Sequence, residues 1–589
     1  MHKRVISTLV VVLMALTMMA QERTDAQMMS IAKAKLAHHT TAKKAKGNAT
    51  QPLTLSTVSE GSQYRMFVAD DGSGYVVVAR NEAFKPIIGY STEPATNLEI
   101  PCCMQACLDM INANLEERLK SAETEEATGK DGATYEEVSP MLTTFWQQGS
   151  PYNQKCPADY TGKTSVTGCV ATAMAMVINY FKYPAAVSNK QGYYFYKTNS
   201  SGTASDTVFV NINSTYQWGK MLNTYTSSSA ADAKEAVAQL MYDCGCAAGL
   251  TYGSGSTGGS TTTAARRFYE IFDYASVNHA SKDYYSDWEW RQLVYDQLKS
   301  GCPLMHSGQD PDNGGHAFVL DGIDADGLVH INWGWGKSTA AYFDMLALTP
   351  TTSSKTYNFE PTGFIYNLKA KDHLDEGEEQ ELQLVVGRGT SSYKNDYYTI
   401  SLKENAETGK TRVIVNTCGV FNWTPVPARC YIGVHYESLD GGTDYDVRFK
   451  SAANNYYAPS EFLSRQGKSY GDITIDHDQT PDNIAPGRYK VSFVGYNDDR
   501  NNLKMRCYIR QRYKGLVYWI LTVGEDGSLS LSDEIVVDGP DSLTPTGIKS
   551  ITTKEHRPAN SHTYNLNGQR VGNDYKGVVI QNGRKVVRH

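Results

Sequence analysis

The sequence reads Gly168-Cys169-Val170-Ala171-Thr172-Ala173 where an apolar stretch begins, and this stretch continues to Phe181. Its composition predicts a helix, which Tyr183-Pro184 should end because proline cannot continue a helix. We therefore expect Cys169 at the N-cap or in the first turn. There the helix N-terminus stabilises a thiolate, and a nearby imidazolium would lower the pKa of the thiol further. Taken alone, such a cysteine is more often a buried structural residue.

A second stretch supplies a candidate base, and it reads Gly314-Gly315-His316-Ala317-Phe318-Val319. Residues 317–320 predict a buried strand, and the turn at residues 324–327 leads into a second strand that ends at Asn332. Two adjacent strands would bring His316 and Asn332 into one neighbourhood. A lone histidine in this setting is more often a satisfied core residue, but the glycines before it and the tryptophans after it favour a functional one.

Trp333-Gly334-Trp335-Gly336 directly follows the second predicted strand. His316 could accept the thiol proton of Cys169 while Asn332, or an indole of Trp333 or Trp335, fixes the orientation of the imidazole. The two stretches together therefore offer a nucleophile, a base and an orienting group.

Four ordered blocks resemble the streptopain-like cysteine peptidases, a family with a papain-like fold. The resemblance spans roughly residues 140–364, and four blocks in order are far more specific than one. The blocks are Trp146-Gln147-Gln148-Gly149-Ser150-Pro151-Tyr152-Asn153, Thr167-Gly168-Cys169-Val170-Ala171-Thr172-Ala173, Gly314-Gly315-His316-Ala317-Phe318-Val319 and His330-Ile331-Asn332-Trp333-Gly334-Trp335-Gly336.

The resemblance implies that Cys169 is the nucleophile and that His316 is the general base and acid. It implies that Gln148 donates from its side chain to the oxyanion, beside the backbone N–H of Cys169. Such donors typically contribute about 100- to 1000-fold in rate because negative charge develops only in the transition state. Gln147 and Gln154 are rival candidates, and we prefer Gln148 because it directly precedes the Gly-x-Pro-Tyr-Asn segment.

The resemblance also implies roles for residues around the dyad. Asn332 and Trp333 are assigned to the catalytic group, with the tryptophan pair walling the histidine. Gly315, Gly258 and Trp335 are assigned to substrate binding. Gly258 lies in Gly253-Ser254-Gly255-Ser256-Thr257-Gly258-Gly259, which resembles a glycine-serine loop that lines the substrate cleft. On composition alone, a flexible surface loop is the more common interpretation of this stretch.

Composition restricts the class of protein further. A chain of 589 residues should hold about three to four domains. The net charge of −7 is modest, and no basic patch indicates nucleic-acid binding. Eleven cysteines leave at least one thiol unpaired, which Cys169 satisfies. We predict neither a cofactor nor a metal site, because Cys244-x-Cys246 is too tight for an ordinary zinc pair. Disulfides among Cys418, Cys430 and Cys507 are compatible with the sequence but are not predicted.

The N-terminal part predicts export and autoinhibition. Residues 1–20 have the basic and apolar regions of a signal peptide, and the apolar run is short for a membrane anchor. We expect a secreted or outer-surface protein. Residues 21–130 form a predicted α+β propeptide that acts as the chain's own inhibitor, with a small accessory domain as the alternative. Its expected elements are two strands near residues 64–68 and 74–80 and a helix near 104–119, and its processing site is Lys130-Asp131 in a polar linker.

The parts after the peptidase domain, which we place at residues 131–365, are predicted to be all-β. Residues 366–545 alternate strands with Gly, Asp and Asn clusters, as in a β-sandwich that binds a surface or a substrate or acts as a spacer. Expected strands lie at 381–386, 412–415, 429–434 and 489–494. Residues 546–589 resemble the C-terminal sorting domain of type IX secretion cargo, which implies a partner in the secretion machinery. A structural β-terminus is the alternative.

The sequence thus predicts an α+β protein and a secreted endopeptidase made as a zymogen. It would cleave protein or peptide substrates through a thioacyl intermediate on Cys169, which water then hydrolyses. One alternative is a surface adhesin whose β domain binds a protein and whose peptidase-like domain is inactive. Another is an amidase that acts on cell-wall peptides, which also uses a Cys-His pair.

Overall fold

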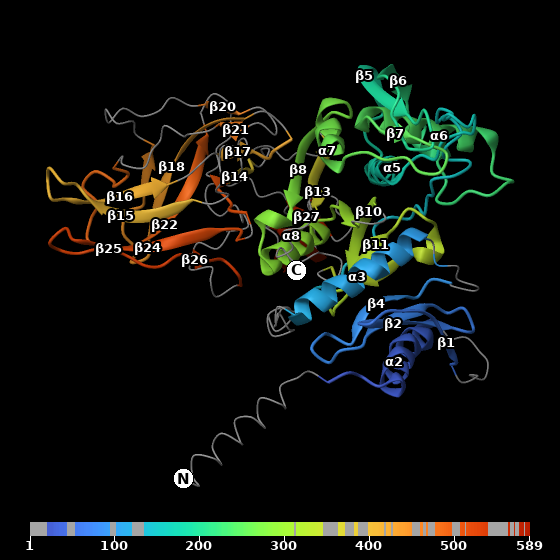
Figure 1. Cartoon of the computed structure of the whole chain (residues 1–589), viewed down its shortest axis with the longest axis horizontal. Coiled ribbons are helices and arrows are strands. Elements are labelled where there is room, and N and C mark those ends of the chain that lie inside the picture. The colour runs from blue at the N-terminus through green and yellow to red at the C-terminus, as the bar shows by residue number, and fades with distance from the viewer. Residues whose placement is uncertain are drawn as a thin grey trace, which may run out of the picture. The chain divides into compact units, whose positions relative to one another are not determined.

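A computed structural model describes most of the chain (Figure 1). The described residues are 21–43, 53–94, 100, 102–120, 135–310, 314–345, 363–370, 382–386, 398–416, 420–425, 428–449, 460–462, 467–468, 478–497, 507–512, 514–539, 563–565, 570–571, 577–581 and 584–588. The chain divides into two compact units, Met1–Gly539 and Pro540–His589. The expected signal peptide and the processing site at Lys130 lie outside the described residues.

The first unit contains a ten-stranded antiparallel sheet in the order β1-β2-β3-β4-β12-β11-β10-β9-β13-β8. The predicted strands around residues 64–68, 74–80, 317–320 and 328–332 are all present. The mixture of this sheet with packed helices confirms the α+β class. The strands are β1 Leu55–Glu60, β2 Tyr64–Ala69, β3 Tyr75–Ala79, β4 Ile87–Ser91, β8 Tyr274–Ser281, β9 Leu304–Asp310, β10 Gly314–Ile323, β11 Val329–Asn332, β12 Ala341–Phe343 and β13 Gly363–Ala370.

Helices cover both faces of this sheet, so the side chains on both faces of its central strands are buried, as in residues 317–323 of β10 and all of β11. Side chains alternate along β10: Ala317 and Val319 join one core with α5, α6 and α7, whereas Phe318 and Leu320 join a second core with α3 and α8. A further helix, α2, packs on β2 and β3. The helices are α2 Asp25–Lys43, α3 Cys102–Lys120, α5 Cys169–Phe181, α6 Ala231–Ala248, α7 Thr261–Glu270 and α8 Asp287–Lys299.

Helix α5 begins at Cys169, as predicted, and is buried on nearly all sides. Every residue from Val170 to Asn179 is buried, because the helix is apolar all round and runs through the core. Its N-cap is Gly168 with φ of 83°, a conformation that glycine adopts without strain. The helix ends at Phe181, and Lys182 takes the left-handed conformation with φ of 52° just before Tyr183-Pro184.

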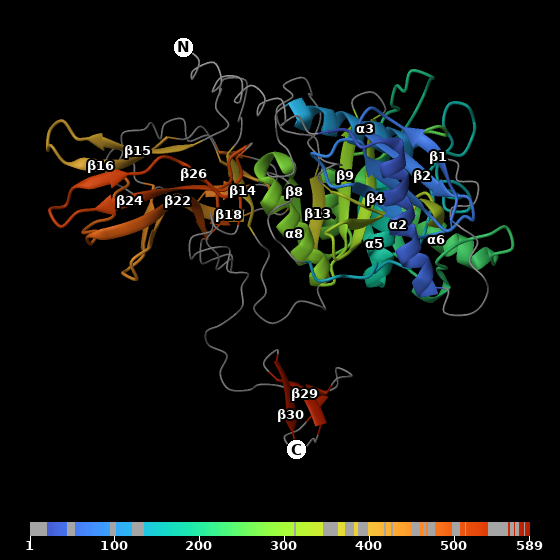
Figure 2. The same cartoon turned by 90° about the horizontal axis from the view of Figure 1, so that it is seen from below.

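The N-terminal strands β1 to β4 form one side of the ten-stranded sheet. β4 pairs with β12 through Tyr90 opposite Tyr342 and Gly89 opposite Phe343. The hydroxyl of Ser91 donates to the carbonyl of Ala340 at 2.6 Å. Figure 1 shows β4 and β2 between β11 and α2, and Figure 2 shows α2 lying across these N-terminal strands. Residues 53–94 therefore belong to the same sheet as the candidate histidine.

A smaller sheet lies beside α6, in the order β6-β5-β7. Its strands are β5 Ala186–Tyr196, β6 Val208–Thr215 and β7 Thr251–Tyr252. β5 and β6 form an antiparallel hairpin, and β7 runs parallel to β5. Because β7 directly precedes the glycine-serine stretch, this sheet fixes where that stretch begins.

Residues after 382 form the predicted strands, arranged in antiparallel sheets around a separate core. Val434, Val491 and Phe493 are fully buried in this core. The strands are β14 Leu384–Val386, β15 Thr399–Glu404, β16 Thr411–Asn416, β17 Val420–Asn422, β18 Ala428–Ser438, β19 Tyr445–Arg448, β20 Ser460–Phe462, β21 Gly467–Lys468, β22 Gly487–Asn497, β23 Cys507–Tyr508, β24 Val517–Val523, β25 Leu529–Leu531 and β26 Ile535–Val536.

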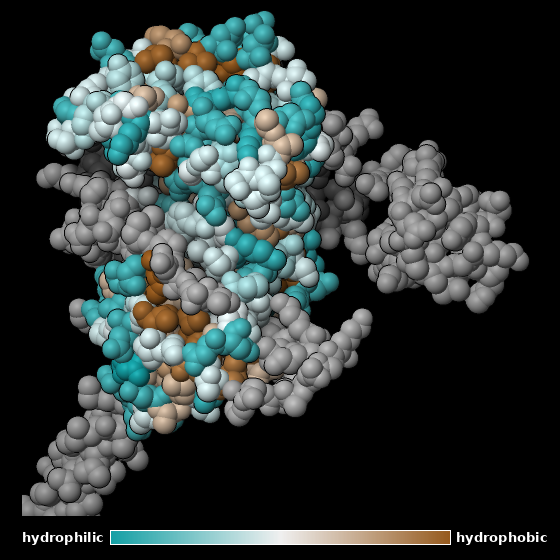
Figure 3. All heavy atoms as spheres, turned by 90° about the vertical axis from the view of Figure 1, so that its right-hand side faces the viewer, coloured by the Kyte–Doolittle hydropathy of each residue, from teal (hydrophilic) through white to brown (hydrophobic). Residues whose placement is uncertain are grey.

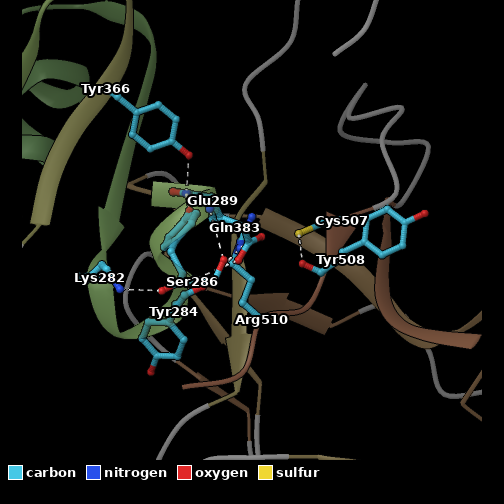
Figure 4. Close-up of polar contacts among 10 residues, drawn as sticks. Lys282, Tyr284, Ser286, Glu289, Tyr366, Gln383, Cys507, Tyr508 and Arg510 are labelled. Atoms are coloured by element: carbon cyan, nitrogen blue, oxygen red, sulfur yellow. Dashed lines mark hydrogen bonds and ion pairs between the residues drawn. The ribbon is translucent and has the colours of Figure 1, made fainter. Parts of the chain in front are cut away.

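This β region contacts residues on and next to α8 and β13 through a polar junction (Figure 4). Arg510 pairs with the buried carboxylate of Glu289 at 2.7 Å, and its guanidinium lies 3.9 Å from the centroid of the Tyr285 ring. Gln383 donates to the hydroxyl of Tyr366 at 2.6 Å. Removing one partner of a buried ion pair leaves an uncompensated charge, so these contacts resist separation. The β region is thus joined to the ten-stranded sheet and its helices by side-chain contacts as well as by the backbone.

The second unit contains a four-stranded antiparallel sheet in the order β28-β27-β29-β30. Its strands are β27 Thr563–Asn565, β28 Arg570–Val571, β29 Gly577–Gln581 and β30 Arg584–Arg588. The short strands expected in the last segment are therefore present.

No helix among the described residues is both long and apolar enough to cross a membrane. On the face drawn in Figure 3, hydrophobic residues form small separate groups among hydrophilic ones. Cys430 and Cys507 are free thiols, so neither takes part in the disulfides that the sequence allowed. Cys418 lies outside the described residues.

Candidate active site

Cys169 stands at the first turn of α5, beside the strand that carries His316. The residue is half-buried, and its thiol accepts hydrogen bonds from the backbone N–H groups of Ala317 and Val170. Ala317 follows His316 directly in β10, so the two predicted residues lie in one neighbourhood. The sequence did not indicate that a strand N–H would reach the sulfur.

His316 is oriented by a backbone carbonyl. Its Nε2 lies 2.9 Å from the carbonyl oxygen of Trp333. A carbonyl oxygen only accepts hydrogen bonds, so Nε2 carries the proton of the neutral ring. Nδ1 is then the basic nitrogen. The orienting group is thus main chain, where the sequence suggested Asn332 or an indole.

The imidazole is also held by stacking. Trp335 lies with its ring 4.1 Å from the His316 ring at an interplanar angle of 22°. Trp333 and Trp335 are themselves stacked at 5.7 Å and 3°. Both tryptophan rings thus stack beside the imidazole, with Trp333 buried and Trp335 half-buried.

The side chain of Asn332 is hydrogen-bonded to backbone groups next to the tryptophan segment. Its amide donates to the carbonyl of Thr144 at 2.7 Å, and its side-chain oxygen accepts from the N–H of Gly334 at 3.3 Å. These bonds fix the backbone at the end of β11, from which the Trp333 carbonyl points. The structure thus places the side chain of Asn332 on backbone groups and the Trp333 carbonyl on the histidine.

Burial shifts the pKa values of both dyad residues away from their charged forms. It raises the pKa of the Cys169 thiol, and the N–H groups of Ala317 and Val170 counteract only part of that rise. It lowers the pKa of His316 to about 4, and the Trp333 carbonyl acts in the opposite direction. The sequence-based expectation of a lowered thiol pKa was therefore wrong for the resting site, because desolvation outweighs the helix N-terminus. Both shifts favour the uncharged forms of the two residues, so a proton transfer from Cys169 to His316 would create both charges together.

Gln148 lies next to the segment that leads into Cys169. Its carbonyl accepts from the backbone N–H of Thr167 at 3.0 Å, and its side chain is half-buried. The rival Gln147 is exposed, with its amide against Gly336, and Gln154 is exposed as well. The backbone of Gln148 is therefore fixed to the segment that leads into Cys169.

The glycine-serine stretch is held in place by backbone hydrogen bonds, although its composition suggested a flexible loop. Thr251 and Gly258 exchange backbone hydrogen bonds at 2.9 and 3.1 Å and so close the loop. A Cβ on Gly168 would lie 2.8 Å from the side chain of Thr257. Gly258 is exposed beside this contact, and Gly315 is exposed in β10 opposite Gln309. The backbones of both predicted substrate-binding glycines are thus exposed to solvent. Gly258 follows the residue that contacts Gly168, and Gly315 directly precedes His316.

Within the described residues, no group of three or more His, Cys, Asp or Glu side chains is arranged to hold a metal ion. The arrangement can instead supply a sulfur nucleophile, a base and hydrogen-bond donors.

A thiol at a helix N-terminus, beside a strand that carries an oriented imidazole, is the arrangement expected of a cysteine peptidase. Residues 146–343 match the model of the Peptidase C10 family. The chain is a cysteine endopeptidase of the streptopain type, and residues 146–343 are the part that is similar to the Peptidase C10 family.

Relatives agree with this assignment. Streptopain of Streptococcus pyogenes is 27% identical over 334 residues, which cover 52% of this chain and 81% of streptopain. The thiol protease/hemagglutinin PrtT of Porphyromonas gingivalis is 26% identical over 315 residues, covering 49% and 35%. A solved prointerpain A fragment from Prevotella intermedia is 29% identical, covers 54% of this chain and 99% of its own, and has a TM-score of 0.48.

Proposed function

We propose that this chain is a secreted cysteine endopeptidase, made as a zymogen, that acts through a Cys169–His316 dyad. Nδ1 of His316 takes the thiol proton, and the thiolate attacks the peptide carbonyl carbon. The imidazolium then gives that proton to the leaving amine, which leaves a thioacyl group on Cys169. Water, deprotonated by the same nitrogen, hydrolyses the thioester and restores the thiol. The observation that supports this proposal is the Nε2 bond to Trp333, which leaves Nδ1 free.

The oxyanion of the tetrahedral intermediate would be held by the Gln148 side chain and the backbone N–H of Cys169. Gln148 is supported by its attachment to Thr167, two residues before the nucleophile. A donor fixed to the same segment as the nucleophile keeps its position during the reaction, which is what transition-state stabilisation requires.

The dyad is tested with Cys169→Ala, which removes the nucleophile and little volume. We expect no hydrolysis of denatured protein or peptides by this variant, and equal inactivity for His316→Ala. Cys246→Ala is the matched control, since Cys246 is fully buried in α6 and its loss should leave activity intact. Full activity in Cys169→Ala would refute the dyad and would favour a different nucleophile.

We also propose that residues 21–130 are the inhibitory propeptide. Besides the β4–β12 pairing, the hydroxyl of Tyr75 donates to the carbonyl of Thr339 at 3.3 Å, and Glu93 pairs with Lys337 at 3.1 Å. These partners follow the segment of Trp333 and Trp335 by a few residues. The N-terminal strands thus hold the part of the domain next to the catalytic histidine.

Purified Cys169→Ala precursor should stay full length, and added active enzyme should trim it near Lys130. Activity on a small peptide should then rise when the propeptide is removed from the wild-type protein. A precursor that is fully active with residues 21–130 attached would show that this segment is an accessory domain.

We further propose export through the signal peptide at residues 1–20 and the type IX route, directed by residues 546–589. The support is that Pro540–His589 forms a compact unit of its own. A variant truncated after residue 545 should be retained in the producing cell, while the full chain reaches the medium or surface. Equal export of both would refute a sorting role.

A further inference from the structure

Asp159 forms an unusually complete anchor in a tight turn before the nucleophile. Its carboxylate accepts from the N–H and hydroxyl of Ser254 at 2.7 and 2.6 Å, and from the N–H and hydroxyl of Thr161 at 2.9 and 2.6 Å. The residue is only 8% exposed. Thr161 belongs to the same turn, whereas Ser254 lies in the glycine-serine loop. The carboxylate therefore joins two segments far apart in the sequence.

The loop held by Asp159 also contacts the segment that leads into Cys169. The N–H of Val166 donates to the carbonyl of Gly253 at 3.2 Å, and the hydroxyl of Thr257 donates to the carbonyl of Val166 at 2.8 Å. Thr257 packs on Gly168, so the loop touches the residue just before the nucleophile. A displacement of the loop would therefore also move the backbone at the start of α5.

An ionised carboxylate such as that of Asp159 is a suitable partner for a glycine-rich loop. Glycine-rich backbone loses much conformational entropy when it is ordered, so it needs strong local bonds to keep one shape. Hydrogen bonds to an ionised carboxylate are roughly twice as strong as neutral ones. The bonds from Ser254 and Thr161 hold the pKa of Asp159 well below its usual range, so the carboxylate stays ionised at neutral and mildly acidic pH.

We propose that Asp159 is a positioning residue that holds the Ser254–Gly258 loop in the shape that binds the substrate backbone. It acts through Ser254 and Thr257 and does not touch the reacting atoms. The inference rests on the proposed function, because it takes Cys169 as the nucleophile beside which the loop stands. A loop that is already ordered binds substrate without first losing that entropy, so Asp159 should affect substrate binding more than the chemical step.

The test compares the fully processed wild-type enzyme with Asp159→Asn on one peptide substrate. The asparagine keeps the shape, but its NH2 group faces donors that need an acceptor. KM should rise about tenfold, as expected when a charge-assisted hydrogen bond is lost, and kcat should stay within about threefold. Ser254→Ala removes one of the four bonds and should raise KM about threefold on the same grounds.

Asp526→Asn is the matched control. Asp526 accepts from the N–H of Ser528 at 3.0 Å in the turn between β24 and β25, in the β region. Its replacement removes a similar bond away from the dyad, and KM should not change. Thermal melting of each variant checks that it is folded, and Ser254→Ala serves as the decisive variant if Asp159→Asn does not fold.

An unchanged KM in folded Asp159→Asn or Ser254→Ala would overturn the inference, as would a fall in kcat at unchanged KM. A KM increase in Asp526→Asn of the same size would overturn it too. These outcomes are separate from a failure of the proposed function, which would appear as activity in Cys169→Ala.

Discussion

Cys169 and Cys246 lie in the same hydrophobic core, on the helices α5 and α6, but only one of them is placed for chemistry. Cys246 sits near the end of α6 and is fully buried, and burial raises its pKa to about 12. Cys169 stands at the first residue of its helix, where backbone N–H groups without intrahelical partners meet the sulfur. The comparison indicates that the position of a cysteine on its helix, rather than its presence in the core, decides whether its thiol has the surroundings that a nucleophile needs.

The largest expected difference between the two helices is in reactivity toward an alkylating agent. In the native processed enzyme, iodoacetamide should modify Cys169 more than about 100-fold faster than Cys246, since only Cys169 is accessible and has a base nearby. Peptide mass spectrometry over time gives both rates, and activity should fall in step with labelling at Cys169. If Cys246 were labelled at a comparable rate in the folded protein, the predicted difference in reactivity between the two thiols would be wrong.

The next largest effect concerns the donor beside Cys169. Gln148→Ala should lower kcat by about 100-fold or more with little change in KM, as for other lost oxyanion donors. Gln147→Ala is the control, because Gln147 is exposed and lies against Gly336. If Gln148→Ala raised only KM, or if Gln147→Ala gave the larger loss in kcat, the oxyanion role would pass from Gln148 to another residue.

A smaller effect concerns the base and its stacking partner. In the Cys169→Ala background, NMR should show His316 titrating near its lowered pKa of about 4, because burial disfavours the imidazolium. Between the unfolded pKa of about 6.5 and this value, only the unfolded chain binds the proton, so stability should fall as pH falls through that window. Trp335→Ala admits water and should raise the His316 pKa by about one unit.

An unchanged His316 titration in Trp335→Ala would show that the stacked indole does not desolvate the ring. Trp218→Ala is a useful control, because it removes an indole near Tyr216 and leaves the tryptophan pair at His316 intact. The His316 pKa should stay where it is in that variant.

The smallest effect on activity is expected from the thiols of α6. Cys244→Ala should leave kcat and KM within about twofold and should lower the free energy of unfolding by about 1 kcal/mol, since it deletes one buried atom from the core. Urea unfolding at neutral pH measures the second quantity. A large loss of activity at unchanged stability would mean that α6 contributes to the reaction directly.

Local patterns in the sequence predicted much of the fold. The apolar run after Gly168 predicted α5 and its end before Pro184. The apolar residues 317–320 and the turn at residues 324–327 predicted β10 and β11. Such patterns are informative because helix and strand periods depend on neighbouring residues. The amphipathic helices α6, α7 and α8 were not predicted, since their mixed composition carries a weaker signal than the apolar stretch of α5.

The sequence by itself predicted Cys169 as the nucleophile and His316 as the base, and it determined the α+β class and the strands of the later domains, because each depends on residue type and short spacing. The tertiary structure alone decided three further points. It placed a main-chain carbonyl, from Trp333, on His316, and a carbonyl has no signature in the sequence. It joined Asp159 to Ser254 and Arg510 to Glu289 across long separations. It also made the pKa of the resting thiol rise, since desolvation depends on everything packed around Cys169 and not on the helix that it begins.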